Sequence, residues 1–209
     1  MNYFYRFGCL DDAARLSALH YACRAELVDS FMCSLGRGFL RAYYQAVLQS
    51  PYSYVICMVD EKGTVQGFTV SAFDAKAHFA AVGRRNIRMF LAATPALFIR
   101  PWLILGILLR RKVMAGQEAD NSFISLDGAR NEFMALDVTA RNGPQAMILM
   151  RRTLDVSKAM GVRALWIEVD EANTRAMQFH LRLGAQVVRS IARPDGKKRN
   201  LMLYKIVRS

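Results

Sequence analysis

Two carboxylates on one apolar stretch are the first side chains in the sequence that could do chemistry. Asp137 lies between Leu136 and Val138 in the stretch 133–138, and Glu132 directly precedes that stretch. Successive side chains of a strand point to opposite faces, so Asp137 should face away from its two apolar neighbours. A lone carboxylate in an apolar strand is uncommon. Each of the two could therefore act as a general base, with a solvent-facing strand position as the alternative.

The cysteines and histidines give no indication of a metal site. The cysteines form no C-x-x-C pair and have no histidine cluster beside them, which are the usual signs of zinc or iron–sulfur binding. We expect no bound metal and interpret the cysteines as reduced, mostly buried thiols. The first residues also lack the basic start and apolar stretch of a secretory signal, so we expect a cytoplasmic protein. The four cysteines are Cys9, Cys23, Cys33 and Cys57.

Size and composition favour one folded domain. The chain has 209 residues, of which 53% are hydrophobic and 22% are charged. These fractions are near those of globular proteins and exclude disordered, collagen-like and coiled-coil chains. We expect a single domain over residues 1–209 with one core.

Hydrophobic periodicity and turn residues predict a mixed α/β fold. A strand over 133–138, a helix over 144–160 and a strand over 164–169 form a strand–helix–strand unit, whose two strands should be parallel. These elements would position the two carboxylates. The other predicted elements are a strand over 3–8, helices over 13–25, 39–48 and 173–183, and hairpins of 54–59 with 65–73 and of 186–191 with 201–206.

The segment 165–184 reads LWIEVDEANTRAMQFHLRLG, a strand followed by a helix. Asn173, Ala176, Phe179 and Gly184 stand at spacings that resemble the acyl-CoA-binding core of the GNAT superfamily of N-acyltransferases. In that family a strand ending in V-x-x-x-N leads to a helix that reads N-x-x-A-x-x-F-Y-x-x-x-G-F. The resemblance implies a central, mostly antiparallel sheet with one splayed parallel strand pair, flanked by helices.

Two positions depart from the family's pattern. Ala185 replaces the terminal aromatic residue, and His180 occupies the place of a tyrosine that protonates the departing thiolate. The resemblance therefore implies that His180 is the general acid, because an imidazole with a pKa of about 6.5 could serve the same role. A histidine that only packs or is solvated is the alternative.

The family also has a phosphate-binding loop, R/Q-x-x-G-x-G/A, before the helix of the strand–helix–strand unit. The corresponding segment here is Arg141-Asn142-Gly143-Pro144-Gln145-Ala146. Its first and last residues fit, but Pro144 falls where the first glycine is expected and removes one backbone donor. The helix start still presents its remaining amides and a positive dipole end to a phosphate.

The resemblance implies acetyl-CoA as the co-substrate. The two parallel strands would splay apart, and the amides of pantetheine would bond to their free backbone groups at Leu136 and Val138. Asn173 would bond the pantetheine arm, serve as an ordinary helix N-cap, or do both. The residues expected at the cofactor are Leu136, Val138, Arg141, Asn142, Gly143, Gln145, Ala146, Asn173, Ala176 and Phe179, and the catalytic candidates are His180, Asp137 and Glu132.

The positive charge is concentrated in one helical insertion at about 76–114. The net charge is +12, and residues 75–117 contain no Asp or Glu but eight Lys and Arg side chains. Apolar runs at 89–99 and 102–109 are too short and too broken to span a bilayer. The segment 84–112 could lie on an anionic membrane surface or grip an anionic ligand. It could also dock on the protein's own core with its arginines solvated. No nucleic-acid-binding signature accompanies the charge.

These patterns favour an N-acetyltransferase that transfers an acetyl group from acetyl-CoA directly to an amine. The basic, apolar insertion favours a small anionic acceptor, such as an amino sugar linked to a nucleotide or a lipid. The alternative is a non-catalytic protein of the same fold, in which Pro144 has reduced cofactor affinity and the insertion docks on a membrane or a protein partner.

Overall fold

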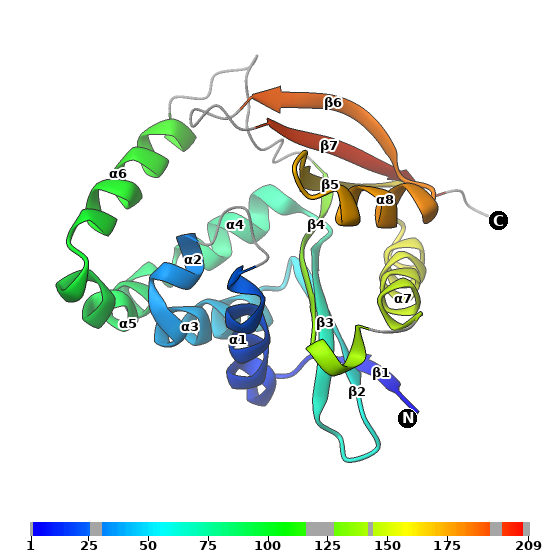
Figure 1. The fold of residues 1–209 in the computed structure, drawn as a ribbon, viewed down its shortest axis with the longest axis horizontal. Coiled ribbons are helices and arrows are strands. Elements are labelled where there is room, and N and C mark those ends of the chain that lie inside the picture. Colours follow the sequence, from blue (N-terminus) through cyan, green and yellow to red (C-terminus); the bar gives the residue numbers. More distant parts are fainter. Residues whose placement is uncertain (1, 26–30, 116–127, 142–143, 193–197, 207–209) are drawn as a thin grey trace.

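The computed structural model describes residues 2–25, 31–115, 128–141, 144–192 and 198–206, which form a seven-stranded sheet with helices on both faces (Figure 1). The strand order is β1-β2-β3-β4-β5-β7-β6. Only β4 and β5 are parallel, and the other neighbouring strands of the described chain are antiparallel. The predicted mixed, mostly antiparallel sheet is confirmed. The strands are β1 (Phe4–Phe7), β2 (Ser53–Val59), β3 (Val65–Ala72), β4 (Ala129–Leu136), β5 (Ala164–Asp170), β6 (Gln186–Ala192) and β7 (Lys198–Lys205).

Helices cover β2, β3 and β4 on both faces. On one face lie α1 (Ala13–Ala22) and α3 (Gly36–Leu48), preceded by the short α2 (Phe31–Ser34). Leu40, Tyr44 and Val47 recur at helical spacing on the buried side of α3, which explains why it packs there. The opposite face carries α7 (Gln145–Ala159), which contacts β2 and β3. Short 3-10 turns precede and follow α1 (Leu10–Asp12 and Cys23–Ala25).

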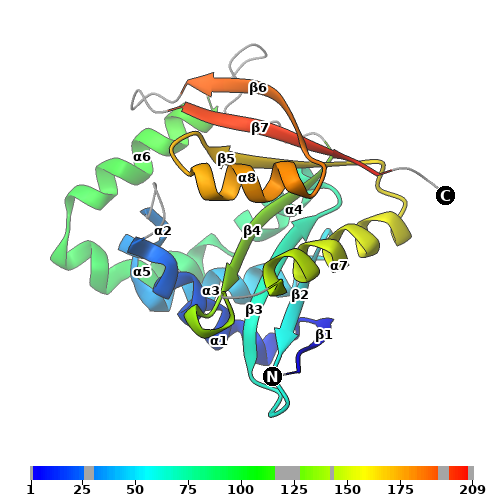
Figure 2. The ribbon, with the colours of Figure 1, turned by 45° about the vertical axis from the view of Figure 1, so that its right-hand side comes forward.

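A second core holds β5 and β7 against α8 (Thr174–Arg182). Leu165, Ile167 and Val169 alternate along β5 and are buried, whereas the residues between them are only partly buried. This alternation places one face of β5 in the core, where it packs with α7 and α8 (Figure 2).

The predicted insertion between β3 and β4 is confirmed as helical. It comprises α4 (Ala75–Gly83), α5 (Asn86–Ile99) and α6 (Trp102–Ala115). α5 packs on α3, and Figure 1 shows α6 at the periphery, away from the sheet. Among the residues that the structure describes, no helix combines the length and the apolar character needed to cross a bilayer.

The two parallel strands separate soon after they meet. β4 and β5 pair only at Ala129 with Leu165 and at Arg130 with Trp166. Beyond these two pairs the strands run apart, as Figure 2 shows. The predicted splayed pair is therefore confirmed, and each strand keeps an inner edge without a strand partner along the rest of its length.

A β-bulge in β4 lies where the separation begins. The pairing with β3 shifts between Val70–Phe133 and Ser71–Asn131, so Glu132 is the extra residue. The Asn131 side-chain amide donates to the Val70 carbonyl at 3.1 Å and to Ser71 Oγ at 2.9 Å. A bulge bends and twists its own strand. This bend accounts for β4 leaving β5 while it stays bonded to β3.

The predicted bounds of β4 were wrong by several residues. The strand occupies 129–136 rather than 133–138, because the polar run Arg130-Asn131-Glu132 is inside it. Asp137 is the N-cap of a 3-10 turn (Val138–Ala140), and Val138 is in that turn with 69% of its surface exposed. Neither residue is a strand position. α7 likewise begins at Gln145, with Pro144 as its N-cap.

Buried hydroxyl groups tie α7 to the sheet. Thr69 Oγ1 on β3 lies 2.7 Å from Thr153 Oγ1, and Tyr54 OH on β2 lies 2.5 Å from Ser157 Oγ. Thr69, Thr153 and Ser157 are completely buried. Buried hydroxyls need partners, so these bonds fix the position of α7 along the sheet.

We expect Thr153→Val to lower the free energy of unfolding by about 1–3 kcal/mol, because it leaves the Thr69 hydroxyl buried without its partner. The double variant Thr69→Val/Thr153→Val should be destabilised by less than the sum of the single variants. Denaturant unfolding of the four proteins measures this, and strict additivity would contradict the coupling.

Candidate functional site

The separation of β4 and β5 opens a cavity of about 830 Å³. Both strands line it, together with α1, α2, the first turn of α7 and most of α8. Its volume is in the range of pockets that bind small molecules and cofactors. Five arginines and three carboxylates line it: Arg130, Arg141, Arg175, Arg182, Arg199, Glu132, Glu168 and Asp170.

A buried charge cluster lies at the fork between the strands. Arg130 Nη1 is 2.9 Å from Glu168 Oε1, and Arg130 Nε is 3.5 Å from Glu132 Oε1. Arg199 on β7 contacts Glu168 at 3.0 Å and Asp170 at 2.9 Å. The side chains of Arg130, Glu132 and Glu168 are each less than 10% exposed. The cluster therefore presents fixed charges to the cavity with little solvent screening.

Glu132 in this cluster has a strongly raised pKa. Its pKa is raised from 4.5 to about 7: burial has the largest effect, the positive charge of Arg130 opposes it, and the negative charge of Glu168 adds to it. Its Oε1 atom is buried and accepts no hydrogen bond within the described chain. Its charge also raises the pKa of Tyr43 on α3, after the larger effect of burial. A carboxyl with a pKa near 7 can take and release protons at neutral pH, as a general base must.

The structure makes Asp137 a different kind of group. Oδ2 accepts from Arg15 at 3.0 Å, and Oδ1 accepts from the Thr139 amide and hydroxyl. Partial burial raises its pKa, but the bonds from Thr139 and Arg15 outweigh that effect and hold the pKa below its usual value. It does not line the cavity. Its role in the structure is to cap the turn that ends β4.

His180 lies on α8 and lines the cavity, as the sequence analysis expects. Its Nδ1 is 2.8 Å from the hydroxyl of Tyr204 on β7. Burial lowers the pKa of His180 to about 4, so the ring is neutral at pH 7. A neutral ring carries one N–H, and a hydrogen bond donated by Tyr204 to Nδ1 would leave that proton on Nε2.

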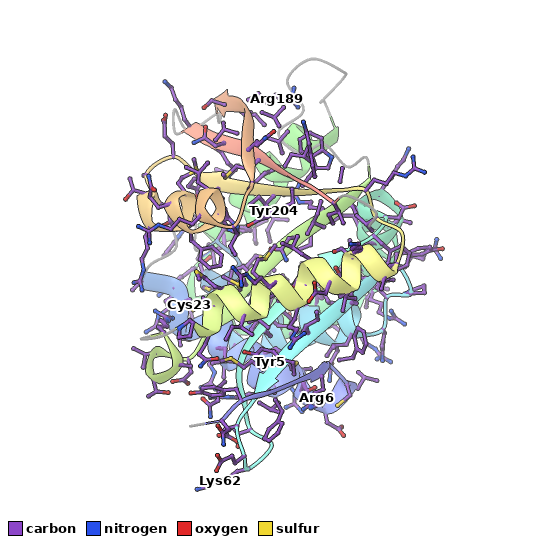
Figure 3. The ribbon with its side chains drawn as sticks, turned by 90° about the vertical axis from the view of Figure 1, so that its right-hand side faces the viewer. Tyr5, Arg6, Cys23, Lys62, Arg189 and Tyr204 are labelled. Carbon is purple, nitrogen blue, oxygen red and sulfur yellow. The ribbon has the colours of Figure 1, made fainter. Side chains whose placement is uncertain are left out.

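The start of α7 forms another wall. Ala146 and Arg141 line the cavity, whereas the side chain of Gln145 accepts a hydrogen bond from Tyr5 on β1. Arg141 Nε donates to the Leu136 carbonyl at 3.0 Å, and its Nη2 lies 3.0 Å from Cys23 Sγ. Figure 3 shows Cys23 close to the first turn of α7. Asn142 and Gly143 lie outside the described residues.

Asn173, Ala176 and Phe179 all line the cavity from the α8 side. The Asn173 side chain accepts from the Ala176 amide at 3.0 Å, so the expected N-cap is confirmed. This bond uses the side-chain oxygen and leaves the amide group's donors. Figure 3 shows Tyr204 beside α8, between the helix and the sheet.

Several residues at the site were missed from the sequence. Arg130 was missed because β4 was predicted to start at 133, although the charged run that precedes Phe133 was a usable signal. His20 was missed because its helix position looked like ordinary core. Its ring stacks on Phe133 with centroids 3.9 Å apart, and its Nδ1 is 2.7 Å from Tyr44 OH.

Within the described ranges, no group of three or more His, Cys, Asp or Glu side chains is arranged to hold a metal ion.

Comparisons with known proteins give the fold its class. No protein-family model matches the sequence, and no curated protein matches it. Among solved structures, it is similar to an N-acetyltransferase from Staphylococcus aureus Mu50, with 14% identity, 99% of this chain and 100% of the other covered, and a TM-score of 0.63.

Two further structures are similar over nearly their whole length. Arabidopsis thaliana NAA60 in complex with acetyl-CoA is 14% identical, with 98% of this chain and 99% of the other covered and a TM-score of 0.60. An acetyltransferase of the GNAT family from Streptococcus pneumoniae is 13% identical, with 99% and 100% covered and a TM-score of 0.56. The chain has the GNAT fold.

The raised pKa of Glu132 has a consequence for stability. Its folded pKa of about 7 is above its ordinary value of 4.5, so the folded state keeps this proton longer than the unfolded state. The associated stability is complete below about pH 4.5 and is lost as pH rises to about 7.

Between about pH 5 and about pH 8, the free energy of unfolding of the wild type should therefore fall by roughly 1–3 kcal/mol relative to that of Glu132→Gln. Denaturant unfolding at the two pH values measures this, with the exposed Glu171→Gln as the matched control. An unchanged difference between wild type and Glu132→Gln would show that Glu132 does not carry a raised pKa.

Proposed function

We propose that this protein is an acetyl-CoA-dependent N-acetyltransferase that transfers an acetyl group directly to an amine. The separation of β4 and β5 beyond Arg130 is the observation that carries the proposal. It leaves inner strand edges that the amides of a pantetheine chain would complete as a ladder. The GNAT fold and the cavity volume of about 830 Å³ support the same conclusion.

The cavity walls fit the parts of such a donor. The inner edge of β4 between Glu132 and Ala135 would bond the pantetheine arm, with Asn173 and Phe179 beside it on α8. The amides of Ala146 and Met147 in the first turn of α7 have no partners within the helix and would face the pyrophosphate. The bound donor would supply the electrophile, which is the carbonyl carbon of its thioester.

Glu132 is the proposed general base. It accepts a proton from the acceptor ammonium, because only a neutral amine has the lone pair needed to attack the carbonyl carbon. It lies two residues beyond Arg130, the last residue of β4 that pairs with β5, and it lines the cavity. Arg130 Nε lies 3.5 Å from its Oε1 atom, and burial is the main cause of its raised pKa.

His180 is the proposed donor to the leaving sulfur. With Tyr204 bonded to Nδ1, the Nε2–H group is the one that can hydrogen-bond the departing thiolate. A thiol with a pKa of about 8.5 leaves readily, so this donor contributes less than the positioning of the two reactants. Asp137 has no part in this proposal because Arg15 and Thr139 already occupy its oxygens.

The acceptor is proposed to be a small amine that carries an anionic group, such as an amino sugar on a nucleotide or lipid carrier. The five arginines of the cavity outnumber its three carboxylates. The free thiols of all four cysteines support a cytoplasmic location.

The second candidate is a non-catalytic protein of the same fold. Pro144 is the N-cap of α7, and the Arg141 side chain is already bonded to the Leu136 carbonyl and Cys23. Both features reduce the donors available to a phosphate. This candidate would bind no acetyl-CoA and would act only through its docking surfaces.

Isothermal titration with acetyl-CoA separates the two candidates, and it needs no acceptor. We expect saturable binding that raises the thermal midpoint, because the donor binds only the folded state. If millimolar acetyl-CoA gives neither binding heat nor a shift of the thermal midpoint, the proposal that the protein is an acetyltransferase is wrong.

Release of free CoA thiol, followed with a panel of amino sugars, nucleotide-linked amino sugars and polyamines, tests the reaction itself. For any accepted amine, kcat/KM should rise with pH through about 7, where Glu132 loses its proton. Glu132→Gln should lower kcat/KM by about 10²- to 10⁴-fold and abolish that rise. Glu171→Gln is the control, and equal loss in both variants would exclude a specific role for Glu132.

His180→Phe tests the leaving-group donor. We expect a lower kcat with acetyl-CoA affinity retained, because the ring is replaced by one of similar shape that lacks the N–H. Tyr204→Phe should lower kcat less, because the His180 ring keeps its N–H group and loses only the hydrogen bond that holds the proton on Nε2. An unchanged kcat in His180→Phe would leave that residue with a packing role only.

A further inference from the structure

Helices α5 and α6 expose an unusual amount of apolar surface. Nine of the nineteen large apolar side chains that are exposed in the described chain belong to these two helices, and their exposed fractions run from 47% to 82%. Large contiguous apolar patches on a protein surface mark sites of association. We name this set the α5–α6 surface: Ile87, Phe90, Leu91, Phe98, Ile99, Trp102, Ile104, Leu105 and Leu108.

Both helices are apolar on two faces, and only one face is covered. Met89, Ala93, Leu97 and Leu103 are buried, and the last three form a cluster with Leu35. Along α5, Ile87, Leu91 and Phe98 recur at helical spacing on another face and are exposed. A helix that is apolar all round is normally buried all round. The uncovered face therefore calls for a partner outside the described chain.

The positive charges around this surface indicate that its partner is anionic. Arg84 and Arg88 lie at the start of α5 and Arg100 at its end, and all three are exposed. No acidic residue occurs between 75 and 117. Aromatic and aliphatic side chains flanked by arginines suit the boundary between acyl chains and anionic headgroups.

A second copy of this chain fits less well. A two-fold contact brings the same surface of both copies together, so the surface must complement itself. The α5–α6 surface would oppose arginines to arginines with no carboxylate between them.

The lengths of the helices define how they would meet a bilayer. Each has 14 residues, which corresponds to about 21 Å. A bilayer core is about 30 Å thick, and Arg100-Pro101 separates the two helices. They fit a position in the plane of the interface.

We propose that the α5–α6 surface docks this protein on the face of an anionic lipid membrane. The docked surface adjoins the cavity rim: a side chain at Gly106 on α6 would come within 3.0 Å of the ring of Phe31, and Phe31 lines the cavity. Docking would therefore bring the α2 side of the cavity close to the lipid. The proposal does not depend on catalysis.

Flotation with vesicles tests it directly. Wild-type protein should float with phosphatidylcholine vesicles that contain phosphatidylglycerol, and much less with phosphatidylcholine alone. Binding should weaken as salt is raised, because the charges are screened. Failure of the wild type to float with anionic vesicles at low salt overturns the proposal.

Two variants locate the surface, each with a matched control. Phe98→Ser/Trp102→Ser removes two exposed apolar side chains, and Phe4→Ser/Phe7→Ser on β1 removes two of comparable exposure. Arg84→Gln/Arg88→Gln/Arg100→Gln removes three charges, and Lys62→Gln/Arg163→Gln/Lys205→Gln removes three exposed charges elsewhere.

Both α5–α6 variants should lose flotation, with about a fivefold loss of affinity for each arginine removed, and both controls should keep it. Equal flotation of the α5–α6 variants and the controls overturns the proposal. A second outcome also overturns it: light scattering shows a wild-type dimer that does not bind vesicles, and Phe98→Ser/Trp102→Ser converts this dimer to a monomer. The α5–α6 surface would then join two copies of the chain. Circular dichroism and thermal unfolding of each variant establish that it is folded.

Discussion

The loss of pairing between β4 and β5 is the feature on which the site depends. Two parallel strands that meet over only two residue pairs would normally continue as a ladder. Here Glu132 is inserted as a bulge, and the Asn131 side chain bonds β3 in place of regular pairing. β4 therefore follows β3 and bends away from β5. The cavity, its inner strand edges and the position of the candidate base all follow from this one irregularity.

Charged side chains are buried at the point where β4 and β5 separate, although burial of charge is normally unfavourable. Buried ion pairs are weak contributors to stability, because removal of water from both partners offsets their attraction. Arg130, Glu132 and Glu168 also contain buried atoms without a well-aligned hydrogen bond in the described chain. Burial in this cluster raises the pKa of the Glu132 carboxyl to about 7. These properties favour proton transfer more than stability.

Three helices are added to the sheet and to the helices that cover it. The helices α4, α5 and α6 are inserted between β3 and β4; α4 and α5 pack on α3, and α6 contacts α5. They contact the cavity wall through Phe31. The insertion and the cavity are therefore in contact through α2.

The sequence alone determined the order of elements and the helical insertion, because both depend on local periodicity and turn residues. The resemblance of the Asn173–Gly184 segment to the GNAT pattern implied the splayed strand pair. The sequence also named Glu132 and His180. It placed the start of β4 four residues too late, since Arg130, Asn131 and Glu132 look like loop until their partners on β3 and β5 are known. It could not separate Glu132 from Asp137. Only the tertiary structure did so, because burial beside Glu168 raises the pKa of Glu132 whereas Arg15, 122 residues away along the chain, occupies Asp137.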